Sequence, residues 1–240
     1  MVGIGPGGAD DRTRRCERAI AASDAVVGYA PYVELLADLT AGKELHASGM
    51  RQEIERCRLA LRLAAQGRTV ALVSSGDAGV YGMAGPALEI AQAEGLLGRV
   101  AIEIVPGVTA ASAAAARLGG PLMTDFAVIS LSDLLVDWPT IRRRLKAAAA
   151  ADLVTVLYNP RSARRRTQLA AAASIFLAAR PPSTPAGVAT AVGSADERVV
   201  LCDLGSLLSQ EVTMRSVVVI GNSTTRVLDG WMVTARGYRL

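Results

Sequence analysis

The segment best suited to chemistry is residues 72–83, where small polar side chains and glycines follow an apolar run. Residues 70–73 are continuously apolar, which is typical of a strand buried on both faces of a parallel sheet. The connection after them combines three glycines with an acid and a phenol: Gly76, Gly79, Gly82, Asp77 and Tyr81. Ligands of open α/β sheets bind at the carboxyl ends of strands, where glycine lets the backbone approach a small molecule closely. An ordinary strand-to-helix connection is the alternative for any one glycine, but the grouping favours a ligand-binding loop.

Two further turns of similar composition follow apolar segments. Residues 3–7 read Gly-Ile-Gly-Pro-Gly after a strand expected at 1–4, and residues 106–110 read Pro-Gly-Val-Thr-Ala after one expected at 100–105. Glycine and proline end regular structure and favour tight turns. The first turn superficially matches a dinucleotide fingerprint, but its proline and its glycine spacing argue against that reading.

The elements that must position these turns alternate in the first half of the chain. Strands are expected at 1–4, 25–28, 68–73 and 100–105, with helices at 12–23, 49–67, 83–90 and 110–118. This alternation predicts a parallel sheet. The second half has helices only at 138–151 and 167–179, between strands at 126–131, 153–158, 187–192, 198–204 and 216–220. Such closely spaced strands leave little room for crossover helices and predict a mixed sheet. We therefore expect two α/β domains, residues 1–120 and 121–240.

Composition excludes several classes of protein. The longest uncharged apolar run, near residues 169–179, is too short to span a bilayer, and the first residues read as a strand and turn rather than a signal peptide. Three scattered cysteines indicate reduced thiols, a cytoplasmic protein and no metal site. Aromatic residues make up 4% of the chain and do not alternate with basic ones, so nucleic-acid binding is disfavoured.

Acid–base and phosphate chemistry are also restricted. The single histidine, His46, would have to carry any Ser-His-Asp triad alone, and no P-loop lysine follows the glycine turns. The net charge is +4, and arginine far outnumbers lysine, which favours carboxylate or phosphate recognition. A compositional bias explains the arginines equally well. What remains is chemistry that depends on positioning, such as methyl transfer from a sulfonium donor.

The three turns, in this order and each after a strand, resemble the tetrapyrrole methylases, which use S-adenosylmethionine. Residues 49–53, 129–135, 157–160 and 221–224 are similar to the branch that methylates precorrin-3B, or its cobalt-containing counterpart, at C17 in cobalamin biosynthesis. The resemblance implies two α/β domains with the donor in a cleft between them, a homodimer, and a tetrapyrrole rather than a nucleic acid or membrane as partner. Two departures are Ala235, where a proline is expected, and the lack of a histidine in residues 123–125.

The resemblance also implies roles for individual positions. The donor-binding candidates are Gly76, Asp77, Val80, Thr109, Ala110, Tyr158, Asn159, Gly187, Ala189 and Met214. The substrate-binding candidates are Gly5, Pro6, Gly7, Met50, Arg51 and Tyr81. For the proton handling that ring contraction needs, the candidates are Ser130, Ser132 and Asp133, with capping of the next helix as an equal alternative. Among the arginines, one or two of Arg51, Arg161, Arg164 and Arg165 are expected to meet substrate carboxylates.

The expected reaction is methylation of precorrin-3B at C17 with ring contraction to precorrin-4, leaving S-adenosylhomocysteine. The alternatives are a corrin methyltransferase acting at C11 or C20, and a tetrapyrrole-binding protein without catalytic activity.

Overall fold

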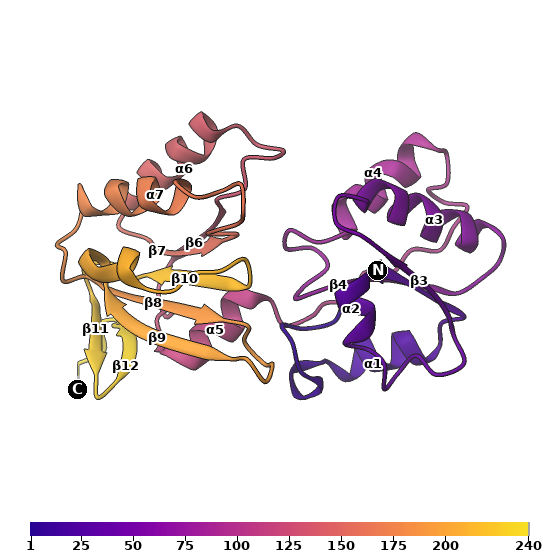
Figure 1. The fold of residues 1–240 in the computed structure, drawn as a ribbon, viewed down its shortest axis with the longest axis horizontal. Coiled ribbons are helices and arrows are strands. Elements are labelled where there is room, and N and C mark those ends of the chain that lie inside the picture. Colours follow the sequence, from indigo (N-terminus) through magenta and orange to yellow (C-terminus); the bar gives the residue numbers. More distant parts are fainter. Residues whose placement is uncertain (240) are drawn as a thin grey trace. The chain divides into compact units, whose positions relative to one another are not determined.

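A computed structural model of the chain describes residues 1–239. The chain forms two compact α/β units, Met1–Ala110 and the residues from Ala111 onward (Figure 1). The α/β fold class, with one parallel and one mixed sheet, is confirmed. The units divide ten residues before the boundary at 120, so the division into domains at that residue stays a prediction.

The first unit is a parallel sheet with helices on both faces. Its strands lie in the order β1-β4-β2-β3, and every pair is parallel. The strands are β1 (Val2–Gly3), β2 (Ala25–Tyr29), β3 (Glu44–Ser48) and β4 (Val70–Ser74). The helices are α1 (Arg14–Ala21), α2 (Ala30–Glu34), α3 (Glu53–Ala65) and α4 (Ala84–Ala93), besides the short 3-10 turn η1 (Ala9–Asp11).

Alternation along the strands explains these two helical layers. Val26 packs with α1 and α2 in one apolar cluster, whereas the next residue, Val27, packs with α3 and α4 in another. Successive strand side chains point to opposite faces, so strands that are apolar at every position need a cover on each face. Figure 1 shows α1 and α2 on one side of these strands and α3 and α4 on the other.

The second unit has a mixed sheet in the order β6-β7-β10-β8-β9. β6 and β7 are parallel and the remaining pairs are antiparallel. The strands are β6 (Phe126–Ser130), β7 (Val154–Tyr158), β8 (Pro185–Thr190), β9 (Arg198–Asp203) and β10 (Ser216–Ile220). One face packs against α6 (Trp138–Ala150), α7 (Gln168–Leu177) and the 3-10 helix η2 (Leu204–Ser209), with Phe176 fully buried. The other described elements are α5 (Ala110–Leu118) and a small sheet of β5 (Gly119–Gly120), β11 (Thr225–Leu228) and β12 (Trp231–Thr234).

Two sequence-based predictions of elements are wrong. Residues 100–105 do not form a strand: Val105 makes an isolated bridge to Val2 and Val100 makes one to Leu97, with no continuous ladder between them. The helix expected from residue 49 begins at Glu53, because Gly49 N–H instead donates to the Gln52 side chain at 3.0 Å and Arg51 takes a left-handed backbone conformation.

Candidate functional site

The turns after β1 and β4 meet directly in the first unit. Gly76 N–H donates to the Gly5 carbonyl at 2.7 Å, and Gly5 N–H donates to the Gly76 carbonyl at 3.1 Å. β1 and β4 are neighbouring parallel strands, so their carboxyl ends lie side by side. The segment before the third turn joins them, since Gly3 N–H donates to the Val105 carbonyl at 2.9 Å. The three predicted turns therefore form one junction.

Glycine is required at this junction because the backbones nearly touch. A Cβ on Gly3 would lie 2.7 Å from both Gly107 N and the Gly76 carbonyl oxygen. A Cβ on Gly107 would overlap that same oxygen. Contacts this short exceed what side-chain repacking can absorb, so any residue larger than glycine would separate the turns.

Asp77 holds two of the turns together through both of its carboxylate oxygens. Oδ1 accepts from Gly79 N–H at 2.8 Å, and Oδ2 accepts from Gly107 N–H at 3.0 Å. The second bond joins the turn after β4 to the turn after Val105. The geometry therefore gives the Asp77 side chain a shaping role, while the expected donor contact stays a prediction.

Gly76 has a left-handed φ of 65°. A Cβ added there would make only ordinary contacts, with Ala110 N at 3.7 Å, Thr109 Cα at 3.8 Å and the Val108 carbonyl oxygen at 3.9 Å. The nearest neighbours of this position are therefore backbone atoms, including the start of α5. Tyr81 in the same turn also has a positive φ, 54°, and its ring is exposed. Backbone strain of this kind is concentrated at functional sites.

Met50 and Arg51 follow β3, the strand at the far edge of the same sheet. Both are exposed, and Arg51 has a φ of 66°. Buried Arg56 supports their turn, because its Nη1 donates to the Gly49 carbonyl at 3.0 Å and to Ser48 Oγ at 3.2 Å. Nothing in the sequence separates Arg56 from the exposed arginines of α3, so its role was missed.

Tyr32 was missed as well. Its hydroxyl shares a hydrogen bond with Ser75 in the turn after β4, and burial raises the pKa of the phenol. The two rings of Tyr29 and Tyr32 meet edge to face with centroids 5.1 Å apart. The only sequence signal was the three-residue spacing of these tyrosines.

Candidate residues of the second unit gather where β6 and β7 end. Ser130 pairs in register with Tyr158, because the two strands are parallel neighbours. Asn159 Nδ2 donates to Ser130 Oγ at 3.0 Å, and Ser132 N–H donates to the same oxygen at 3.2 Å. The Tyr158 hydroxyl accepts from Ala111 N–H, in the first turn of α5, at 2.7 Å.

Asp133 does not cap a helix in the structure. Its Oδ2 accepts from Gln168 Nε2 at 2.9 Å, whereas Asp137 caps α6 by accepting from Thr140 N–H at 3.2 Å. The capping alternative is therefore wrong for Asp133, and its expected catalytic role stays a prediction.

Three donor-binding candidates lie apart from this group. Gly187 and Ala189 lie in β8, which β10 separates from β7, and both are buried. A Cβ on Gly187 would overlap the Leu118 side chain, so close packing of α5 explains the glycine. Met214 is exposed before β10. Their role at the donor stays a prediction.

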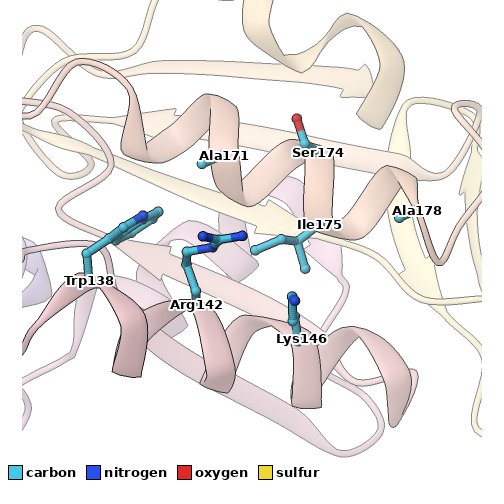
Figure 2. Close-up of a pocket in the computed structure, with 7 residues that line it drawn as sticks. All are labelled: Trp138, Arg142, Lys146, Ala171, Ser174, Ile175 and Ala178. Carbon is cyan, nitrogen blue, oxygen red and sulfur yellow. The ribbon is translucent and has the colours of Figure 1, made fainter.

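A groove between α6 and α7 is distinct from both groups (Figure 2). It has a volume of about 570 Å³, and its walls include Trp138, Arg142 and Ile175. None of the predicted site residues lines it. Arg142 and Lys146 of α6 make one wall of the groove basic.

No group of three or more His, Cys, Asp or Glu side chains that could hold a metal is found within residues 1–239. His46 lies in β3 with Nε2 2.6 Å from Glu44 Oε1, and the three cysteines are free thiols. Over the same residues, no helix is both long enough and apolar enough to cross a membrane.

Comparison with known proteins identifies the family of this chain. The sequence profile of the tetrapyrrole (corrin/porphyrin) methylases matches residues 1–208. The chain belongs to the tetrapyrrole methylases. The match includes all three turns of the junction as well as the ends of β6 and β7.

Relatives within this family match the chain over its whole length. A probable cobalt-factor III C(17)-methyltransferase of Salmonella typhimurium is 46% identical, with 100% of this chain and 99% of that protein covered. A precorrin-3B C(17)-methyltransferase of Sinorhizobium sp is 40% identical over 95% of this chain and 90% of that protein. The cobalt-factor III methyltransferase of Priestia megaterium is 42% identical, but the match covers only 45% of its length.

Solved structures of tetrapyrrole methylases have the same fold. The methyltransferase CobJ superposes with a TM-score of 0.93 at 37% identity, covering 98% of each chain. A uroporphyrin-III C-methyl transferase from Thermus thermophilus, solved in complex with S-adenosylhomocysteine, superposes with a TM-score of 0.70 at 25% identity, over 92% of this chain and 95% of that one.

Proposed function

We propose that this protein transfers a methyl group from S-adenosylmethionine to C17 of precorrin-3B or its cobalt-containing counterpart, with contraction of the macrocycle, in cobalamin biosynthesis. The observation that carries the proposal is the full-length match, at 46% identity, to a probable cobalt-factor III C(17)-methyltransferase. The match to CobJ at a TM-score of 0.93 supports the same reaction class.

The junction of the first unit fits the expected donor. A bound sulfonium donor supplies an already activated methyl group, so the protein needs shape and exclusion of water more than strong acids or bases. The left-handed Gly76 leaves its backbone uncovered by a side chain of its own, and backbone atoms of residues 108–110 are the nearest neighbours of that position. Gly76, Val80, Thr109 and Ala110 would contact the donor there, with Asp77 keeping the turns in register.

The second unit would contribute Tyr158 and Asn159 to the donor and hydroxyl groups to the substrate. Ring contraction moves protons as well as carbon. Ser130 Oγ already accepts from Asn159 and from the Ser132 backbone, so it is held in a fixed orientation. We propose that Ser130, Ser132 and Asp133, at the end of β6, handle these protons.

The substrate carries many carboxylates, which suits a chain of net charge +4. Met50, Arg51 and Tyr81 are the exposed side chains proposed for the substrate, together with the turn of Gly5, Pro6 and Gly7. We also propose a cytoplasmic homodimer, which sedimentation equilibrium would test: a single species of monomer mass would reject it.

Incubation with precorrin-3B and methyl-labelled donor, followed by mass and carbon NMR analysis of the product, tests the reaction directly. A label at C17 of a contracted macrocycle is the expected result, and a parallel incubation with the cobalt-containing substrate identifies the preferred form. Label at C11 or C20 would reassign the site of methylation. Pigment binding without affinity for S-adenosylhomocysteine would show a carrier instead of an enzyme.

A further inference from the structure

One arginine of the segment after β7 behaves differently from its neighbours. Arg161, Arg164 and Arg166 are exposed, whereas Arg165 is half-buried. Burial lowers the pKa of the Arg165 guanidinium, opposed by the nearby Asp133 carboxylate. An arginine so placed has given up part of its hydration, and its contacts must compensate for that loss.

Those contacts join two loops. Arg165 Nε donates to the Asn159 carbonyl oxygen at 2.6 Å, and its Nη1 donates to Ser132 Oγ at 3.3 Å. Asn159 follows β7 and Ser132 follows β6, and these are adjacent parallel strands. One rigid planar group therefore spans both strand ends, which a flexible ammonium group could not do with the same geometry.

The residue that Arg165 holds has an unusual backbone conformation. Asn159 has a φ of 51°, in the left-handed region, which asparagine adopts more readily than other residues with a side chain. The backbone of the loop that carries Arg165 is also held in place. Arg165 N–H donates to Ser162 Oγ at 3.0 Å, and Ser162 N–H donates to the Arg165 carbonyl at 3.1 Å.

We propose that Arg165 is a positioning residue that locks the ends of β6 and β7 by bridging the Asn159 carbonyl and the Ser132 hydroxyl. This inference rests on the proposed function, in which those strand ends hold the donor and handle protons. A hydroxyl oxygen that accepts from a cation must direct its own proton elsewhere, so Arg165 also orients the Ser132 O–H. Preorganisation of this kind is what a reaction governed by alignment needs.

The test compares Arg165→Ala and Arg165→Lys with Arg166→Ala, an exposed neighbour of the same charge that is not among the candidate site residues. Binding of S-adenosylhomocysteine by calorimetry, kcat and KM for the pigment, and thermal midpoints would be measured on the full chain. Arg165→Ala is expected to weaken binding and lower kcat about tenfold each, the effect of losing roughly one charge-assisted hydrogen bond. KM for the pigment and the thermal midpoint should stay close to those of the wild type, and Arg166→Ala should match the wild type throughout.

Chemical rescue separates this role from a general structural one. Guanidinium ion at low, non-denaturing concentration should restore part of the affinity of Arg165→Ala, while ammonium should not. Arg165→Lys, which keeps the aliphatic stem and the charge, should show the same direction of loss even if the alanine variant fails to fold. Wild-type affinity and kcat in either Arg165 variant, or an equal loss in Arg166→Ala, would overturn the proposal.

A wild-type chain that binds no S-adenosylhomocysteine would reject the proposed function instead. The positioning role would then be decided by crystal structures. Asn159 should leave the left-handed region in Arg165→Lys. An unchanged φ at Asn159 would show that Arg165 is not needed to hold it.

Discussion

Asp77 shows how a residue expected to bind a ligand can act through the backbone. Its position after β4 agrees with the sequence-based expectation, yet both carboxylate oxygens accept from backbone N–H groups. Sequence spacing identified the residue but not its partners, because Gly107 is 30 positions away and comes near Asp77 only in the folded chain, where Val105 bridges to Val2 of β1.

Asp77→Asn is therefore expected to loosen the junction. An amide keeps one acceptor oxygen but turns its NH₂ group toward the second N–H, so the link to Gly107 or Gly79 is lost. Affinity for S-adenosylhomocysteine should fall about threefold to tenfold, and further in Asp77→Ala. Calorimetry measures this, with Asp229→Asn in the turn between β11 and β12 as the control. Unchanged affinity in both Asp77 variants would remove Asp77 from the donor site.

The three thiols should be unreactive in the native protein. Burial raises the pKa of Cys16, Cys57 and Cys202 to about 11, so almost no thiolate is present at pH 8. Ellman's reagent is expected to react slowly with the folded chain and fully after denaturation in urea. Rapid release of colour from the native protein at pH 8 would contradict the burial of these side chains.

At the scale of elements, the periodic segments were predicted well and the irregular ones were not. The ranges of α5 and β10 agree with the expected 110–118 and 216–220. β3 was missed because its burial pattern is mostly exposed, so it carries little apolar signal on the edge of the sheet. The β11–β12 hairpin was missed because apolar and polar residues do not alternate regularly in its sequence, and its apolar residues Val227, Leu228 and Trp231 are exposed.

The candidate site was also predicted in part: its turns were placed correctly, but its buried side-chain contacts were not. Turns next to well-defined strands, such as that of Gly76, were placed correctly at strand ends. The contacts of Arg56 and Arg165 were not, because a buried arginine and an exposed one look alike in sequence. Their burial depends on which strands become neighbours.

Two glycine-to-alanine substitutions test the packing of elements. Gly107→Ala puts a Cβ into the Gly76 carbonyl oxygen and should destabilise the protein by about 1–3 kcal/mol while abolishing binding of S-adenosylhomocysteine. Gly85→Ala in α4 meets no atom within 4 Å and should stabilise by up to about 1 kcal/mol through helix propensity. Urea denaturation measures both. Equal stability of the two variants would contradict the close approach of the turns.

The turn between β8 and β9 should contribute to acid sensitivity. Glu197 accepts from Gly193 N–H at 2.6 Å and from Arg117 Nε at 2.8 Å, and the backbone bond foremost lowers the pKa of its carboxyl. A lowered folded pKa means that its stabilisation is present at neutral pH and is lost as the pH falls through that pKa.

Glu197→Gln should accordingly lose less stability than the wild type between about pH 5 and pH 3. Urea midpoints across that range measure the difference. Glu211→Gln, which removes an exposed ion pair with Arg198, is the control and should follow the wild type. Parallel curves for wild type and Glu197→Gln would show that the carboxylate is not stabilised in the folded state.

For the whole molecule, net charge should govern the encounter with an anionic pigment. A chain of net charge +4 attracts a polycarboxylate, and salt screens that attraction. Raising NaCl from about 0.05 to 0.5 M is expected to increase KM for the pigment several-fold, since the Debye length shrinks accordingly. Affinity for S-adenosylhomocysteine, which carries no net charge at neutral pH, should change little under the same titration. A salt-independent KM would show that the arginines do not contribute to capture.

The crowding at the glycine junction also limits how this scaffold can be redesigned. Because the carbonyl of Gly76 leaves no room for a side chain on Gly3 or Gly107, saturation libraries at those positions should return only the parental residue. Gly49, where a Cβ would meet nothing closer than 3.9 Å, and Leu135, which is 94% exposed, tolerate variation. Variants with a different preference for the pigment should therefore be sought in the loops that contain Gly49 and Leu135, with the residues of the glycine junction left unchanged.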